Sequence, residues 1–123
     1  MKRRVVITGL GALSPIGNNA STMWENAKQG VNGIGPITHF DTTDFKVKIA
    51  VEVKDFKPED YIDKKLSKRM DRFSQFGVAA AKEAFADSEI DIEEIDPTRM
   101  GVIVSSGIGG LNTIEKEHIK ALA

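Results

Sequence analysis

The 123-residue sequence contains no cysteine, one tryptophan, one tyrosine and two histidines. Without cysteine the chain forms no disulfide and offers neither a thiolate metal ligand nor a cysteine nucleophile. An excess of charge of one sign is also missing, because 17 basic and 18 acidic side chains give a formal net charge of −1. This balance argues against a generally basic surface of the kind that binds nucleic acid or an anionic membrane. A charged partner must therefore meet a local patch.

Long hydrophobic runs are absent too, since no apolar stretch approaches the roughly 20 residues that a membrane helix needs. The basic residues at positions 2–4 precede a short apolar stretch, but Thr8, Gly9 and Gly11 interrupt it, so it is not a signal peptide. We therefore expect a cytoplasmic protein. The length, with 41% hydrophobic and 28% charged residues, suits one globular domain and is too short for two.

Two short apolar runs, at residues 3–9 and 100–104, predict strands that are buried on both faces. A glycine-rich turn and a helical pattern follow each of them. For the first helix, Thr22 and Glu25 fit a capping box and Gly30 a carboxyl-terminal cap. This order of elements predicts an α/β fold with a parallel sheet. Residues 45–53 alternate apolar and polar side chains and predict an edge strand with one covered face.

Small and apolar residues recur at helical spacing from about 64 to 86, which predicts one helix or two abutting ones. Pro58 suits the first turn of a short preceding helix, and Asp63 can cap the next helical stretch. At roughly 100° per residue, five cations share an arc of about 140° on this helix. They are Lys64, Lys65, Lys68, Arg69 and Arg72. Like charges at this spacing repel, so we expect carboxylates to offset them, either on a partner or in the chain itself, such as Asp63 or Asp71.

Two glycine turns are candidate ligand sites. Residues 9–14 begin like the dinucleotide-binding motif G-x-G-x-x-G, but Ser14 stands in place of the third glycine and the required acidic strand end is missing. A tight turn is the favoured interpretation. Residues 107–110 place the apolar Ile108 between glycines at the carboxyl end of a predicted strand, where α/β sheets usually bind ligands. A packed turn and a ligand site remain equally open there.

Metal and cofactor sites are not expected. Glu115 and His118 form an E-x-x-H pair without the second pair and the extra glutamates that a di-metal site requires. His39 lies near Asp41 and Asp44 in a loop without enough further ligands. No serine-histidine-acid arrangement is present either.

Several motifs follow one another in an order typical of one enzyme family. Val5-Val6-Ile7-Thr8-Gly9-Leu10-Gly11 is followed by Ser14-Pro15-Ile16-Gly17. Further along stand Arg69-Met70-Asp71-Arg72-Phe73 and Ser105-Ser106-Gly107-Ile108-Gly109-Gly110. Together these motifs resemble the β-ketoacyl-acyl carrier protein synthases, and the bacterial elongating type in particular.

The resemblance implies a thiolase-like layered αβαβα fold, of which residues 1–123 are expected to form the amino-terminal portion, in a truncated chain. It also implies a reaction: an acyl group on a cysteine is condensed with malonyl-carrier protein, with loss of carbon dioxide, to give a 3-ketoacyl-carrier protein. The cysteine and two histidines that this chemistry needs are not in the chain, because His39 and His118 match no catalytic motif of the family. We expect no catalytic residue here and no activity from this chain alone.

What the resemblance leaves to this chain is substrate handling. The cations at 64, 65, 68 and 69 match the helix on which the family docks acidic acyl carrier protein, and Arg72 extends it. Gly107 and Ile108 match the acyl pocket near the interface of a homodimer. The alternatives are a non-catalytic module that binds an acidic protein through its basic helix and, less well supported, a small nucleotide binder.

Overall fold

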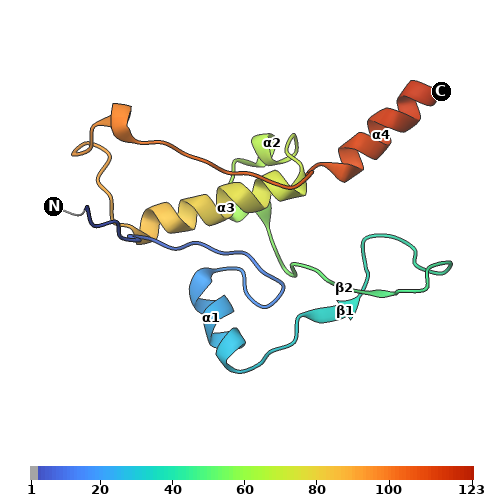
Figure 1. The fold of residues 1–123 in the computed structure, drawn as a ribbon. Coiled ribbons are helices and arrows are strands. Elements are labelled where there is room, and N and C mark those ends of the chain that lie inside the picture. Colours follow the sequence, from blue (N-terminus) through green and yellow to red (C-terminus); the bar gives the residue numbers. More distant parts are fainter. Residues whose placement is uncertain (1–2) are drawn as a thin grey trace.

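The computed structural model describes residues 3–123. In chain order its elements are α1 (Ala20–Lys28), β1 (Ile34–Pro36), β2 (Ile49–Val51), the 3-10 helix η1 (Pro58–Asp60), α2 (Lys64–Ser67), α3 (Arg72–Asp87), the 3-10 helix η2 (Pro97–Arg99) and α4 (Leu111–Leu122). The 16-residue α3 is the longest element. The other segments are arranged around it, and α4 projects away from it at one end (Figure 1).

The predicted helices form, with changes at their ends. Helix α1 begins at Ala20, before the predicted cap, because Asn19 is the N-cap and its side chain accepts a hydrogen bond from the backbone N–H of Thr22 at 2.7 Å. The capping box at Thr22 and Glu25 is therefore wrong. Gly30 has φ 67° just beyond the helix, a left-handed conformation that glycine adopts without strain. The long helical pattern divides into α2 and α3, which was one of its two predicted forms.

Residues 3–9 and 100–104 are not strands in the described chain, so the prediction of two buried strands is wrong. Neither segment pairs with another strand within residues 3–123. Val5 and Ile103 are 94% and 95% exposed. Their β-branched sequences favour an extended backbone, but a strand also needs a neighbour that accepts and donates its ladder hydrogen bonds. Within the described residues that neighbour is missing.

Both extended segments nevertheless lie along α3 (Figure 1). At Gly9 and Gly11 the backbone passes so close to α3 that an added Cβ would overlap the carbonyl oxygens of Ala84 and Ala80. On the other segment, Val104 lies beside Gly77 of α3. The first glycine turn is thus explained by close packing on a helix, without a bound nucleotide.

Glu83 joins three parts of the chain. Its Oε2 accepts a hydrogen bond from the backbone N–H of Ala12 at 2.9 Å, and its Oε1 accepts one from the N–H of Ala20 at 2.8 Å. One turn later, Asp87 accepts from the N–H of Leu10 at 2.8 Å. Ala20 is the first residue of α1, where backbone N–H groups lack helical partners and a carboxylate is favoured. The α3 carboxylates therefore fix both the first glycine turn, at residues 9–14, and the start of α1.

The edge-strand prediction is confirmed only over its centre. Residues Ile49–Val51 form β2, which pairs antiparallel with β1, a strand that the turn-rich composition of residues 31–43 did not predict. Ile34 lies opposite Val51, and all the large apolar residues of this two-stranded ribbon are exposed. The predicted covered face is therefore uncovered, because no other layer of the described chain packs against it.

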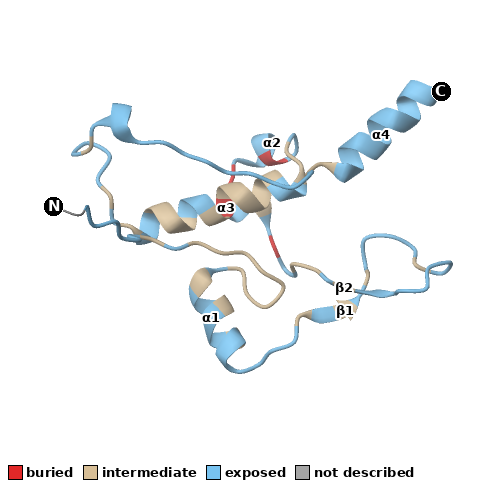
Figure 2. Cartoon of the chain, viewed as in Figure 1, coloured by how far each residue is buried: buried red, intermediate tan, exposed pale blue. Residues whose placement is uncertain are grey.

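The core is small. Its buried apolar residues are Phe56, Ile62 and Ala79, and the ring of Phe56 packs edge-on against Phe76 with centroids 4.9 Å apart. The accessible surface is 10528 Å². A compact monomer of 13.4 kDa exposes only about 6,500 Å², so the chain is open and mostly exposed (Figure 2). No helix within residues 3–123 combines the length and apolar character needed to cross a bilayer.

Candidate functional site

The first candidate site surrounds the short helix α2. Asp63 caps this helix, because its Oδ1 accepts hydrogen bonds from the N–H groups of Lys65 and Leu66 at 2.9 and 3.0 Å. The predicted cap is thus confirmed. Beyond the helix, the side-chain amide of Gln75 donates to the carbonyl oxygens of Ser67 and Met70 at 2.8 and 3.3 Å. These bonds stabilise the break between α2 and α3, which the sequence did not locate.

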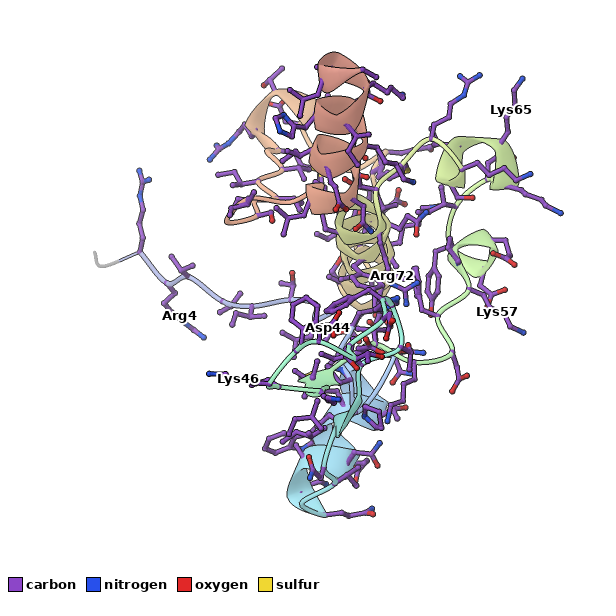
Figure 3. All side chains as sticks on the ribbon, turned by 90° about the vertical axis from the view of Figure 1, so that its right-hand side faces the viewer. Arg4, Asp44, Lys46, Lys57, Lys65 and Arg72 are labelled. Atoms are coloured by element: carbon purple, nitrogen blue, oxygen red, sulfur yellow. The ribbon has the colours of Figure 1, made fainter. Side chains whose placement is uncertain are left out.

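Four exposed cations gather on and just after α2, and we call them the α2 cluster. They are Lys64, Lys65, Lys68 and Arg69. Within residues 3–123 none of them forms an ion pair shorter than 4.0 Å. The two carboxylates considered as internal partners are engaged elsewhere, since Asp63 caps α2 and Asp71 accepts a hydrogen bond from Thr113. Lys65 points away from the rest of the chain (Figure 3). The cluster is therefore unpaired basic surface, free to meet acidic groups of another molecule.

Arg72, the fifth predicted cation, is oriented differently. It donates a hydrogen bond to the backbone carbonyl of Val53 at 3.1 Å. Its guanidinium carbon lies 5.9 Å from the ring centroid of Phe56 and 5.1 Å from that of Phe76. The prediction that all five cations share one face of a single helix is therefore wrong, because helix α2 ends at Ser67 and helix α3 begins at Arg72. Leu66, which the sequence pattern places on the face opposite the cations, is 54% exposed.

The second candidate site is the turn at residues 107–110, which we call the glycine turn. Gly109 and Gly110 have φ 69° and 52°, and Gly110 occupies the N-cap position of α4. Both values lie in the left-handed region, so the turn needs glycine at these positions. Ile108 is 76% exposed, and an added Cβ at Gly107 would meet no atom within 4 Å. In this chain Ile108 therefore presents its apolar side chain outward, and it remains a predicted pocket residue.

A hollow that the sequence did not predict lies between α3 and the second extended segment. Its volume is about 840 Å³, and its lining includes Phe73, Phe76, Phe85, Val102 and Val104. The small residues of α3 at positions 77, 80 and 81 are the sequence signal for it, because short side chains leave space beside the helix. The hollow adjoins the glycine turn through Ser105 and Ser106.

The remaining titratable groups form no reactive constellation in the part of the chain that the structure describes. Groups of three or more metal-ligating side chains are not found in that part. His39 lies 3.8 Å from a carboxylate oxygen of Glu52. The pKa of Glu52 is lowered chiefly because the hydroxyl and the backbone N–H of Thr38 donate to its carboxylate at 2.7 and 3.0 Å, with His39 adding a smaller effect. The Glu52 carboxylate therefore stabilises a loop and is not a candidate general base.

Comparison with known proteins identifies the class of this chain. Residues 2–122 match the family described as "Beta-ketoacyl synthase, N-terminal domain". The chain therefore belongs to the β-ketoacyl synthase family, and the resemblance seen in its motifs is confirmed.

Individual relatives narrow the comparison. The 3-oxoacyl-[acyl-carrier-protein] synthase 2 of Staphylococcus aureus is 55% identical over 116 residues, which are 94% of this chain and 28% of that protein. The enzyme of the same name from Synechocystis is 46% identical over 117 residues, which are 95% of this chain and 28% of that protein. The chain thus spans little more than a quarter of the relatives that it matches.

Solved structures of ketosynthases also resemble this chain. A type II polyketide acyl-carrier protein in complex with its ketosynthase bound to the hexaketide matches with TM-score 0.75 and 33% identity, covering 99% of this chain and 32% of the other. The ishigamide ketosynthase/chain length factor matches with TM-score 0.70 and 37% identity, covering 77% of this chain and 24% of the other. The predicted fold class, the amino-terminal part of a thiolase-like α/β fold, is confirmed.

Proposed function

We propose that this chain is the amino-terminal portion of a 3-oxoacyl-[acyl-carrier-protein] synthase that elongates fatty acids in the cytoplasm. The observation that carries the proposal is the 55% identity over 116 residues to an enzyme of that name. The open structure supports it, because the accessible surface exceeds that of a compact monomer by about 4,000 Å². Such an excess is several times the roughly 800 Å² that each partner buries in a standard interface. Further polypeptide is expected to cover it, from the rest of the enzyme and from the second subunit of a homodimer.

The proposed reaction is a decarboxylative condensation. An acyl thioester forms on a cysteine, malonyl-carrier protein loses carbon dioxide, and the resulting carbanion attacks the thioester carbonyl and releases the cysteine thiolate. The product is a 3-ketoacyl-carrier protein. This chain has no cysteine and thus no nucleophile for that step. Its proposed part is to bind the carrier and to shape the path of the acyl chain.

The α2 cluster is the proposed dock for the acidic acyl carrier protein. Its four cations are exposed and unpaired within the described chain, whereas Arg72 is held against two aromatic rings. We therefore assign docking to Lys64, Lys65, Lys68 and Arg69 and give Arg72 a structural role. A solved relative contains a ketosynthase in complex with an acyl-carrier protein, which supports this type of partner. Exposed charge pairs mainly speed and orient such an encounter.

Gly107 and Ile108 are proposed to line the acyl pocket once the neighbouring polypeptide is in place. The exposed side chain of Ile108 is then apolar surface for the acyl chain, and its bulk limits the length accepted. We expect Ile108→Phe to reduce kcat/KM for long acyl chains more than for short ones. An unchanged ratio between long and short substrates would remove this assignment.

A chimera tests the proposed function. Residues 1–123 replace the matching segment of the Staphylococcus aureus synthase, and formation of 3-ketoacyl-carrier protein is measured by mass spectrometry. We expect condensation by the chimera and none by the isolated chain. A folded chimera that makes no product would contradict the proposal. If the isolated chain alone bound carrier protein tightly and folded cooperatively, the alternative of a non-catalytic acidic-protein binder would be favoured.

A further inference from the structure

One long-range hydrogen bond connects the segment after the α2 cluster to the segment after the glycine turn. The hydroxyl of Thr113 donates to Oδ1 of Asp71 at 2.5 Å, across 42 positions of sequence. Asp71 is the N-cap residue of α3, yet its side chain makes no capping hydrogen bond there. Its carboxylate is instead turned to the first turn of α4, where partial positive charge favours an anion.

The same contact is closely packed. An added Cβ at Gly109 would lie 2.7 to 2.9 Å from three ring carbons of Phe73, and one at Gly110 would lie 2.9 Å from Oδ2 of Asp71. Both glycines have positive φ, so backbone conformation and packing each restrict the turn to these residues. A hollow of about 260 Å³ lies beside this contact and is lined by residues of both segments. The hydrogen bond from Thr113 therefore adds a directional contact to a junction that is already packed through its two glycines.

Two other threonine-aspartate bonds show how different this arrangement is. Thr43 donates to Asp41 and Thr98 donates to Asp96, each at 2.7 Å and each between residues two positions apart. Both bonds lower the pKa of the aspartate that accepts them. They shape single loops, whereas the bond between Thr113 and Asp71 fixes two distant segments relative to each other.

We propose that Asp71 and Thr113 are positioning residues for acyl-chain selectivity. The inference rests on the proposed function, because it takes Ile108 as a pocket residue. Ile108 immediately precedes the two glycines that pack on residues 71–73. The hydrogen bond holds the glycine turn in one place, so Ile108 meets the acyl chain at a fixed depth. Without the bond the turn takes several positions and discrimination between chain lengths falls.

The test uses the active chimera and one matched pair of variants. Thr113→Val removes the hydroxyl at nearly constant volume, and Thr98→Val makes the same change in a threonine-aspartate bond outside the junction. The ratio of kcat/KM for long and short acyl-carrier substrates is measured, together with KM for the carrier. We expect Thr113→Val to reduce the ratio about 5-fold, in keeping with the loss of a partly exposed hydrogen bond to a charged group. Thr98→Val leaves the ratio unchanged, and Thr113→Ser restores it.

The possible results separate this inference from the proposed function. If Ile108→Phe shifts the ratio and Thr113→Val does not, the positioning role is refuted and the pocket stands. If neither variant shifts it, both the pocket and the positioning role are lost. An equal fall in activity for every chain length would indicate a merely structural bond and also overturn the inference. Should Thr113→Val fail to fold, Asp71→Ala removes the same bond from its acceptor side, and the same results decide.

Discussion

Charge reversal in the α2 cluster is the most direct test of carrier docking. The double variant Lys65→Glu with Arg69→Glu replaces two exposed, unpaired cations by carboxylates. Each exposed ion pair contributes about 0.2 to 1 kcal/mol. Reversal removes two attractions and adds two repulsions of similar size, so the encounter with an acidic carrier weakens by about 2 kcal/mol. That corresponds to roughly a 30-fold rise in KM at low salt.

The assay compares two substrates in the chimera, acyl groups on carrier protein and the same acyl groups on coenzyme A. The KM rise should appear with the carrier and be absent with coenzyme A. It should shrink as salt is raised, because the Debye length falls from about 10 Å at 0.1 M to about 3 Å at 1 M. The control is Lys46→Glu with Arg99→Glu, which makes the same change in net charge away from α2. Equal losses on both substrates, or an equal KM rise in the control, would refute docking at α2.

Two further predictions concern residues whose contacts lie inside the chain. Arg72→Gln should destabilise the chimera by roughly 2 kcal/mol, from the lost hydrogen bond to a carbonyl and two cation-π contacts, and chemical denaturation measures it. Its KM for carrier should rise no more than its KM for coenzyme-A substrates, and a carrier-specific rise would return Arg72 to the dock. Glu83→Ala should speed hydrogen exchange at the amides of Ala12 and Ala20 by about 10- to 100-fold, since each loses a bond to a charged acceptor. Unchanged exchange at both amides would show that Glu83 does not hold this junction.

Several local features of the fold followed from sequence, although the cap of α1 proved to be Asn19 and not Thr22. The cap at Asp63, the proline at the start of η1 and the helix from Leu111 depend on neighbouring residues only. The prediction of strands at residues 3–9 and 100–104 was wrong, because a strand depends on a pairing partner that local composition does not reveal. The predicted bounds of the edge strand, 45–53, were wider than those of β2 for the same reason.

In the candidate sites, too, features that depend on neighbouring residues could be predicted and features that depend on distant residues could not. The cations around α2 could be found by charge patterning, because four of them are neighbours in sequence. Arg72 was misplaced because the helix breaks between it and α2, and nothing in the local pattern marked where. The bond between Asp71 and Thr113 joins residues 42 positions apart, so only the three-dimensional structure could reveal it.

The hydrogen bonds donated by the side-chain amide of Gln75 stabilise the break between α2 and α3. In a continuous helix, any change of length or phase near residue 65 would rotate every side chain downstream, including those on α3 that line the apolar hollow. With the break, α2 can change its charges, or its length by a residue, without altering the register of α3. The proposed carrier dock on α2 can therefore diverge between related enzymes at a different rate from the face of α3 that lines the hollow.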